Sequence, residues 1–360
     1  MLKRLPIALL SLAFLLNIGL VKADRLQLSA LEQGSLDSSL LLDIDVAGQR
    51  LVAVGEQGAI IFSDDEGDKW RQAKVPVSAM LTAVNFLNHT AGWAVGHDGV
   101  LLSSKDSGTQ WQLILDGNQL NQLRAKAIEK SIAELSVQSE YDPVELEHLE
   151  YQLDDALFAV DEGASSPLLD IAFIDSQKGF AVGAYGLFIQ TEDAGSNWYY
   201  TGHKLPNPEG LHFNRLFYSK QGELFVLGEA GLLLKSNDKG LSWESLSLPY
   251  QGSFFSMVEG DELYLMGLRG NALKRVESGV WEQIELPVKS TINDAVEVDG
   301  KLYLVGQGGA LLQKVASGFE AFSKRGLLSY SAVTHLEHQL IAVGESGVTK
   351  IALEEGAENE

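Results

Sequence analysis

A short glycine pattern recurs seven times along this chain: an apolar residue and a Gly are followed, three residues later, by a second Gly. The first glycines stand at positions 55, 96, 183, 228, 267, 306 and 344. The steps between them are 41, 87, 45, 39, 39 and 38 residues, so one step has about twice the length of the others. A repeat of about forty residues with glycine turns is typical of small β-sheets arranged in a ring.

Residues 168–205 show what one repeat contains. Four short apolar or alternating stretches, each typical of a strand, lie at 169–173, 179–183, 187–190 and 198–200. The paired glycines lie between the second and third stretches, where we expect both to take the positive φ of a tight turn. The sequence therefore predicts an all-β protein, a seven-bladed β-propeller with four-stranded blades. The blades are expected within residues 24–360, at 40–76, 80–115, 167–205, 210–249, 252–287, 290–324 and 329–353.

A second motif, Ser/Thr-x-Asp-x-Gly-x-x-Trp, follows the third strand in four repeats. This is the Asp-box, the signature of bacterial neuraminidase (BNR) repeats. A repeated aspartate invites a catalytic or calcium-binding interpretation. However, the hydroxyl and carboxylate can accept backbone N–H bonds within their own turn while the indole packs on neighbouring strands, so we predict a structural role. The copies are Ser63, Asp65, Gly67 and Trp70; Ser104, Asp106, Gly108 and Trp111; Thr191, Asp193, Gly195 and Trp198; and Ser236, Asp238, Gly240 and Trp243.

The seventh repeat has too few residues for a fourth strand, because it ends in the acidic stretch 354–360. Residues 25–32 alternate in the manner of a strand and precede the first strand of blade 1. We expect them to pair as the outer strand of blade 7, which would close the ring by joining its two ends.

Residues 116–166 account for the long step and contain neither motif. Apolar residues recur at helical spacing in two stretches, which predicts an α-helical hairpin inserted between blades 2 and 3. Asp142 can cap the second helix, with Pro143 in its first turn and Glu145 completing a capping box. Either the two helices simply pack on each other, or they form a docking arm. The length of the insertion favours docking, with Leu123 and Leu149 as candidate contact residues.

Residues 1–23 have a basic start, an apolar run and a small-x-small ending at Ala23. This pattern predicts a signal peptide that is cleaved after Ala23, and a retained N-terminal anchor is the alternative. The expected location is the periplasm, with a position peripheral to the inner membrane as a second option. After cleavage 24 basic and 49 acidic residues remain, a net charge of −25, so neither nucleic acid nor direct lipid binding is expected. The absence of cysteine excludes disulfides and thiol chemistry.

The turns between second and third strands of a propeller share a face with the connections between blades. The residues between the paired glycines are therefore expected to gather there, beside the helical hairpin. His97 and Asp98 also resemble a catalytic or metal-binding fragment, although such a pair in a turn is more often simply solvated. No metal and no cofactor is predicted. The candidate partner-binding residues of this face are Glu56, His97, Asp98, Tyr185, Glu229, Arg269, Gln307 and Glu345.

The chain lacks the nucleophile, zinc-protease and phosphate-loop motifs of common enzyme classes. Sialidases share the Asp-box but bind the substrate carboxylate with three arginines. The eight arginines after residue 23 stand at unrelated positions of the repeat: 25, 50, 71, 124, 215, 269, 275 and 325. The sequence therefore predicts a protein without enzymatic activity.

The segments Gly92 to Trp111 and Gly179 to Trp198 combine the glycine turn with the Asp-box, and this combination resembles the photosystem II stability/assembly factor family. The resemblance implies a seven-bladed propeller and a non-enzymatic chaperone that uses an arginine-rich patch on one face. Arg269 is the one arginine that we can place at such a turn, and the helical insertion is foreign to the photosynthetic pattern. The chain looks more like exported relatives in non-photosynthetic bacteria, which implies a resistance-nodulation-division type exporter as partner.

Two functional hypotheses follow from these observations. The first is a monomeric exported scaffold that assists a membrane or envelope protein complex through protein–protein contacts. The alternative is a glycan-binding or glycoside-hydrolase-like BNR-repeat protein, which would need two carboxylates a short distance apart in a pocket.

Overall fold

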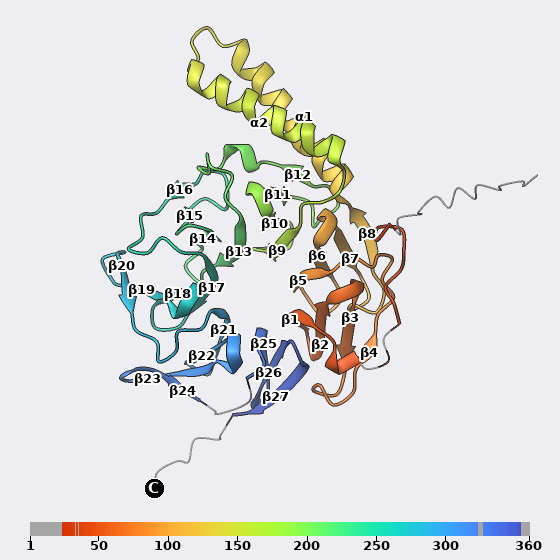
Figure 1. Ribbon diagram of the computed structural model, residues 1–360, viewed down its shortest axis with the longest axis vertical. Coiled ribbons are helices and arrows are strands. Elements are labelled where there is room, and N and C mark those ends of the chain that lie inside the picture. The colour runs from red at the N-terminus through yellow and green to blue at the C-terminus, as the bar shows by residue number, and fades with distance from the viewer. Residues whose placement is uncertain (1–23, 33, 35, 323–326, 354–360) are drawn as a thin grey trace, which may run out of the picture.

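In the computed structural model, which describes residues 24–32, 34, 36–322 and 327–353, seven small antiparallel sheets surround a common axis (Figure 1). Six sheets have four strands, and the seventh has three among the described residues. Two helices, α1 (Gly117–Ser136) and α2 (Pro143–Glu162), project from the rim between the second and third sheets. The predicted fold class, a seven-bladed β-propeller with a helical hairpin between blades 2 and 3, is confirmed. The predicted signal peptide, 1–23, lies outside the described residues.

Each blade begins at the axis and ends at the rim, because its strands are paired in chain order. Blades 1 and 2 contain β1 (Leu41–Ala47), β2 (Arg50–Gly55), β3 (Ile60–Ser63), β4 (Arg71–Gln72), β5 (Leu81–Phe86), β6 (Gly92–Gly96), β7 (Leu101–Ser104) and β8 (Gln112–Leu115). Blades 3 and 4 contain β9 (Leu168–Phe173), β10 (Gly179–Gly183), β11 (Phe188–Thr191), β12 (Tyr199–Tyr200), β13 (Phe213–Tyr218), β14 (Leu224–Gly228), β15 (Leu233–Ser236) and β16 (Glu244–Ser245). Blades 5 to 7 contain β17 (Phe254–Glu259), β18 (Leu263–Gly267), β19 (Ala272–Arg275), β20 (Trp281–Ile284), β21 (Ile292–Val298), β22 (Lys301–Gly306), β23 (Leu311–Val315), β24 (Gly318–Ala321), β25 (Tyr330–Leu336), β26 (Gln339–Gly344) and β27 (Gly347–Ala352).

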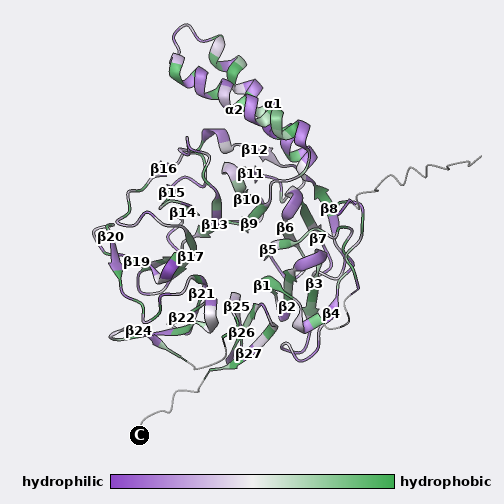
Figure 2. Cartoon of the chain, viewed as in Figure 1, coloured by the Kyte–Doolittle hydropathy of each residue, from purple (hydrophilic) through white to green (hydrophobic). Residues whose placement is uncertain are grey.

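The hydrophobic cores lie between neighbouring blades. Phe180 and Phe188 of blade 3, for example, pack with Phe213 and Val226 of blade 4, and all four side chains are fully buried. The second strand of each blade is covered on both faces by its neighbours, so it is a continuous apolar run rather than an alternating one. Figure 2 shows hydrophobic residues along many of the strands and hydrophilic ones in many of the turns.

The paired glycines have two different roles, which corrects the expectation that both take positive φ. Gly183 is extended, with φ −168°, and a Cβ at this position would lie 2.2 Å from the carbonyl oxygen of Pro167. That oxygen accepts a hydrogen bond from Ala184 N at 3.0 Å, so the turn is held against the start of the blade. Gly186 has positive φ, at 70°, as does Tyr185 before it, at 56°. The first glycine thus permits a close backbone approach, and the second supplies the turn.

The Asp-box side chains form hydrogen bonds within their own turns. Ser63 Oγ donates to Asp65 Oδ1 at 2.9 Å and accepts from Gly67 N at 2.9 Å, while Asp65 Oδ1 also accepts from Lys69 N at 2.8 Å. The other three copies repeat this geometry. In the fourth copy, hydrogen bonds from Ser242 and Ser236 lower the pKa of Asp238 to about 2. The Asp-box carboxylates therefore accept their hydrogen bonds from groups of their own turns.

Residues 25–32 do not form the predicted outer strand of blade 7. Asp24 starts a turn, because its side chain and its carbonyl accept from Leu26 N and Gln27 N, and this turn replaces the extended conformation. The segment then follows blades 1 and 2, where Ser78 N donates to Arg25 O and Ala30 N donates to Val75 O. Leu26 and Ala30 pack against the core between these two blades. The segment is therefore buried at the junction of blades 1 and 2 and not at blade 7.

Side-chain packing joins the two ends of the ring instead. Leu41, Ile44 and Leu51 of blade 1 share a buried cluster with Ile341 and Val343 of blade 7. Outside this cluster, Lys350 Nζ pairs with Asp68 at 2.5 Å. The short helix η1 (Leu36–Ser38) contacts β27. Blades 7 and 1 are thus held by contacts between their two sheets, with no strand shared among the described residues.

Aspartates on the innermost strands connect one blade to the next. Asp43, Asp170 and Asp294 occupy the third position of β1, β9 and β21, and each is buried. Their carboxylates accept hydrogen bonds of 2.7–3.0 Å from backbone N–H groups on the first strand of the following blade. The three donors are Val84 on β5, Leu216 on β13 and Val333 on β25.

Arg215 is the counterion for these aspartates. Its guanidinium lies 3.7 Å from Asp170 Oδ2 and 3.3 Å from Asp294 Oδ1. Burial raises the pKa of Asp43 to about 8, although Arg215 and the bond from Val84 N oppose the shift. Burial, together with the negative charges of Asp294 and Asp170, therefore favours a protonated Asp43 at neutral pH.

Replacement of Gly183 by Ala should lower the free energy of unfolding by about 3 kcal/mol or more, because the new methyl group would overlap the Pro167 carbonyl. Gly308→Ala is the matched control. Gly308 also lies in a glycine turn, with φ 64°; an added methyl group would have no atom of the described residues within 4 Å, and blade 4 has Ala230 at this position. Its expected cost is about 1 kcal/mol. Equal losses in urea denaturation would contradict the assigned role of the first glycine.

Asp43→Asn should flatten the pH dependence of stability. The folded-state pKa of Asp43 is raised above its unfolded value, so its contribution is fully present below pH 4 and is lost as pH rises towards 8. Asn can still accept the bond from Val84 N but does not titrate. From pH 5 to pH 8, the free energy of unfolding should fall more in the wild type than in the variant. The difference between the two falls should be at least about 1 kcal/mol. Parallel curves for the two proteins would contradict this assignment.

Candidate partner-binding surface

The helical hairpin, called the arm below (residues 117–162), begins directly after β8. Asp116 caps α1 by accepting from Gln119 N, and the Gln119 side chain accepts from Asp116 N in return, so the capping box lies on α1. Asp142 caps α2 through Val144 N, with Pro143 in the first turn as predicted. The capping box predicted with Glu145 does not form at the start of α2, where Asp142 accepts from Val144 N. Buried Asn121 joins the two helices by donating to the carbonyl oxygens of Ala159 and Gly163.

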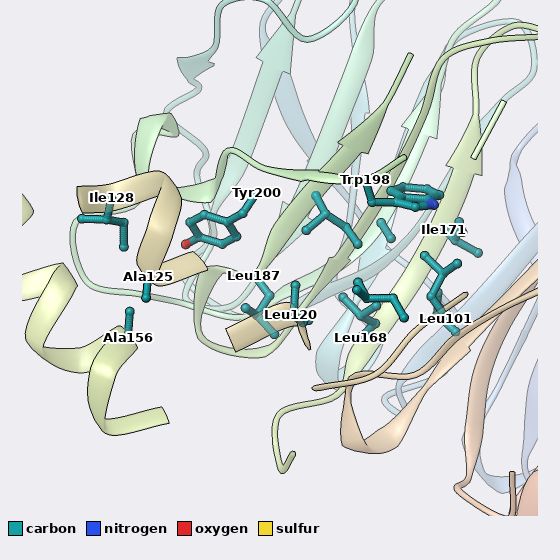
Figure 3. Close-up of a cluster of buried hydrophobic side chains, with 14 of the residues drawn as sticks. Leu101, Leu120, Ala125, Ile128, Ala156, Leu168, Ile171, Leu187, Trp198 and Tyr200 are labelled. Carbon is teal, nitrogen blue, oxygen red and sulfur yellow. The ribbon is translucent and has the colours of Figure 1, made fainter. Parts of the chain in front are cut away.

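The root of the arm is part of the core of blades 2 and 3. Leu120, Ala125 and Ile128 of α1 belong to one buried cluster with Leu187 and Tyr200 of blade 3, shown in Figure 3. Of the two predicted contact residues in the arm, Leu149 is buried between the helices and Leu123 is half-buried against the same cluster. Their role is therefore to hold the arm together, and a partner would contact other residues.

Polar contacts fix the arm over blade 3. Arg124 lies beside Tyr200 at the base of the arm, and its guanidinium is 3.6 Å from the Asp155 carboxylate. Ser131 Oγ lies 2.8 Å from His203 Nε2, and the His203 ring stacks on Tyr200. Burial, together with the charge of Lys204, lowers the pKa of His203 to about 4. The imidazole is therefore neutral at pH 7.

A cleft of about 190 Å³ separates the arm from the glycine turn of blade 3. Arg124, Tyr151 and Asp155 line it from the arm. Tyr185, from the turn, lines the opposite side; its side chain is 58% exposed, and its ring centroid lies 4.8 Å from that of His212. Tyr185 was predicted from the sequence as a contact residue, and the structure places it next to the arm.

Three of the other predicted residues have local structural contacts. Glu56, Glu229 and Glu345 occupy the same turn position, and each carboxylate accepts from the backbone N–H of the residue just before the first strand of its blade. Asp98 is 5% exposed and pairs with Arg25 at 2.7 Å, so it is not presented to a partner as expected. No sequence pattern indicated this pair, because its members are separated by 73 residues.

His97, Arg269 and Gln307 remain at the predicted face, with His97 half-buried and the other two exposed. Their turns pack against the connections between blades, as expected: Gly270, for example, lies against the backbone of Val288 and Lys289. Arg25, Arg124 and Arg215 each pair with a carboxylate of their own surroundings, and Arg50 and Arg71 share Asp64.

Within the described residues, no group of three or more His, Asp or Glu side chains is arranged to hold a metal ion. Neither α1 nor α2 is apolar enough over a sufficient length to cross a membrane. The axial set of Asp43, Asp170, Asp294 and Arg215 was not predicted from the sequence. The shared third position of the aspartates in their strands was a usable signal, which alignment of the repeats would have exposed.

Residues 26–140 and 154–253 match the profile of the family described as photosynthesis system II assembly factor YCF48. The chain belongs to this family. Photosystem II stability/assembly factor HCF136 of Arabidopsis thaliana is 27% identical over 178 residues, which cover 44% of this chain and 42% of that protein. Photosystem II assembly lipoprotein Ycf48 of Synechococcus sp. (strain CC9902) is 32% identical over 90 residues, 25% of this chain and 27% of that protein. The chain thus spans less than half the length of these curated relatives.

Solved structures of YCF48 share the fold. The structure described as YCF48 bound to D1 peptide aligns with a TM-score of 0.63 at 16% identity and covers 91% of this chain and 99% of that one. YCF48 from Cyanidioschyzon merolae aligns with a TM-score of 0.58 at 13% identity, over 88% and 96% of the two chains. The resemblance inferred from the glycine turns and Asp-boxes is confirmed, and the family and these relatives are described as photosystem II assembly or stability/assembly factors.

Acid should loosen the attachment of the arm through His203. Because the folded-state pKa of His203 is lowered from 6.5 to about 4, its stabilising contribution is present above pH 6.5 and is lost as pH falls through 4. Amide hydrogen exchange of residues 125–135, corrected for intrinsic rates, should therefore be faster at pH 4.5 than at pH 7. His203→Gln keeps a side chain that can bond to Ser131 but does not titrate, so it should reduce the effect. Equal acid sensitivity in both proteins would contradict this role.

Proposed function

We propose that this chain is an exported, non-enzymatic scaffold that assists the assembly or function of a membrane or envelope protein complex. The observation that carries the proposal is the cleft between the arm and the turn of blade 3, where a rigidly supported helix faces the exposed Tyr185. A groove between fixed elements, lined by aromatic and polar side chains, suits a protein segment as ligand.

Membership of the YCF48 family supports this class of function. A relative of the same fold is described as bound to a D1 peptide, which supports a peptide segment of a partner as the ligand of this chain. The partner itself is proposed to be an envelope complex, with a resistance-nodulation-division type exporter as the first candidate from the sequence resemblance. The signal-like pattern at 1–23 supports export to the periplasm.

Tyr185→Ser should greatly reduce recovery of the partner when the protein is purified from cross-linked cell envelopes. Because most of the Tyr185 side chain is exposed, the melting temperature should stay within a few degrees of the wild type. This variant is a cleaner test than deletion of the arm, because deletion would uncover the Leu187 and Tyr200 side chains that α1 covers.

Leu241→Ser is the matched control for this experiment. Leu241 is 76% exposed and lies in the Asp-box turn of blade 4, which belongs to the opposite face of the propeller from the glycine turns. Recovery of the partner should be unchanged in this variant. Loss of the partner with Leu241→Ser, or its full retention with Tyr185→Ser, would count against the proposed surface.

A further inference from the structure

The outer side of α2 carries a row of exposed apolar residues. Val144, Tyr151 and Phe158 are 70%, 72% and 63% exposed. They are spaced seven residues apart, which is close to two helical turns, so they lie on one side of the helix. The opposite side packs against α1 through Leu149 and Ala156, so the exposed row does not take part in the packing of the two helices. Three such residues in line on a projecting helix form an interaction surface.

The same helix is strongly acidic and has no lysine or arginine. Its exposed acidic residues are Glu145, Glu147, Glu150, Asp154, Asp155, Asp161 and Glu162. Of these, Glu147 and Asp154 lie about one turn from Tyr151 and therefore border the apolar row. Arg124, on the other helix, supplies a countercharge to Asp155. The surface thus combines apolar anchors with a border of net negative charge.

The row is continuous with the cleft described above. Tyr151 stands at the middle of the row and also lines the cleft, together with Asp155 and with Glu209 from the loop before β13. A segment bound along α2 would therefore pass from the apolar row to Tyr185. Because the root of α2 is held by Asn121 and by the core of blade 3, the surface is preorganised.

We infer that the outer face of α2 binds a cationic amphipathic segment of the partner protein, with apolar side chains set against Val144, Tyr151 and Phe158 and with lysine or arginine against the acidic border. This inference rests on the proposed scaffold function and specifies the chemistry of its ligand. A helix laid along a helix matches anchors that repeat every two turns. A second copy of α2 or an anionic lipid surface would bring like charges together, so neither fits this face.

The test uses the full chain without its predicted signal peptide and a fluorescently labelled 18-residue peptide. The peptide carries leucine at positions i, i+4, i+7 and i+11 of a helix and lysine beside them, and a second peptide has glutamate in place of each lysine. Fluorescence anisotropy at low salt should show saturable binding of the lysine peptide, at least tenfold tighter than binding of the glutamate peptide. Raising the salt concentration to 0.5 M should weaken binding severalfold.

Two sets of variants separate the two parts of the surface. Tyr151→Ser with Phe158→Ser should weaken binding of the lysine peptide at least tenfold, while helicity measured by circular dichroism stays unchanged. Glu147→Gln, Glu150→Gln and Asp154→Asn together should weaken it and reduce its salt dependence. Leu241→Ser, which removes an equally exposed apolar residue elsewhere, should have no effect.

Several outcomes would overturn the inference: equal binding of both peptides, unchanged binding by the Tyr151/Phe158 double variant, concentration-dependent dimerisation that this double variant abolishes, or adsorption to phosphatidylglycerol vesicles that it abolishes. The peptide experiment is independent of the envelope purification. If the peptide fails to bind while Tyr185→Ser still loses the envelope partner, the chemistry inferred for α2 is wrong and the scaffold function stands.

Discussion

The hydrogen bonds that buried aspartates accept from the next blade are the interaction on which the ring depends. The first strand of each blade has a neighbouring strand on one side only, so backbone N–H groups facing the axis need other acceptors. Asp43, Asp170 and Asp294 supply them across blade boundaries, and Arg215 offsets their charge. A similar bond runs from Phe173 N to Asn85, so the device is not confined to carboxylates. The polar groups at the axis are thereby engaged in holding blades in register.

Because the polar groups at the axis are engaged in contacts between blades, the proposed recognition surfaces lie at the rim and on the face of the glycine turns. The same division appears within the candidate residues: Glu56, Glu229 and Glu345 hold their turns, and Asp98 holds the N-terminal segment. Tyr185 and the outer side of α2 are instead exposed to solvent. In the arm the buried residues form the support, and the exposed ones form the surface offered to a partner. The proposed scaffold therefore keeps the YCF48 fold and adds a contact surface on an insertion.

Features encoded within one repeat could be predicted from the sequence, and features that depend on contacts between repeats could not. The glycine period predicted seven blades, and each Asp-box formed the local turn that its residues suggested. The role of Gly183 was misjudged, because the reason for glycine there is the carbonyl of Pro167 and not its own φ. The position of residues 25–32 was also wrong. The alternation of apolar and polar residues predicts which side chains are buried, but it does not predict the part of the propeller against which they pack.

The junction between blades 7 and 1 has a consequence for how the ring comes apart. Every other pair of neighbouring blades is linked by the chain itself. Among the described residues, this pair is held by an apolar cluster, by the contact of η1 with β27 and by polar contacts at the border of the cluster. Reversible separation should therefore begin at this junction, and each blade next to it would lose one covered face at a time, as in the fraying of a linear repeat protein. The arm is rooted between blades 2 and 3, away from that junction, so a partner held there would stay bound to an intact part of the ring during such opening.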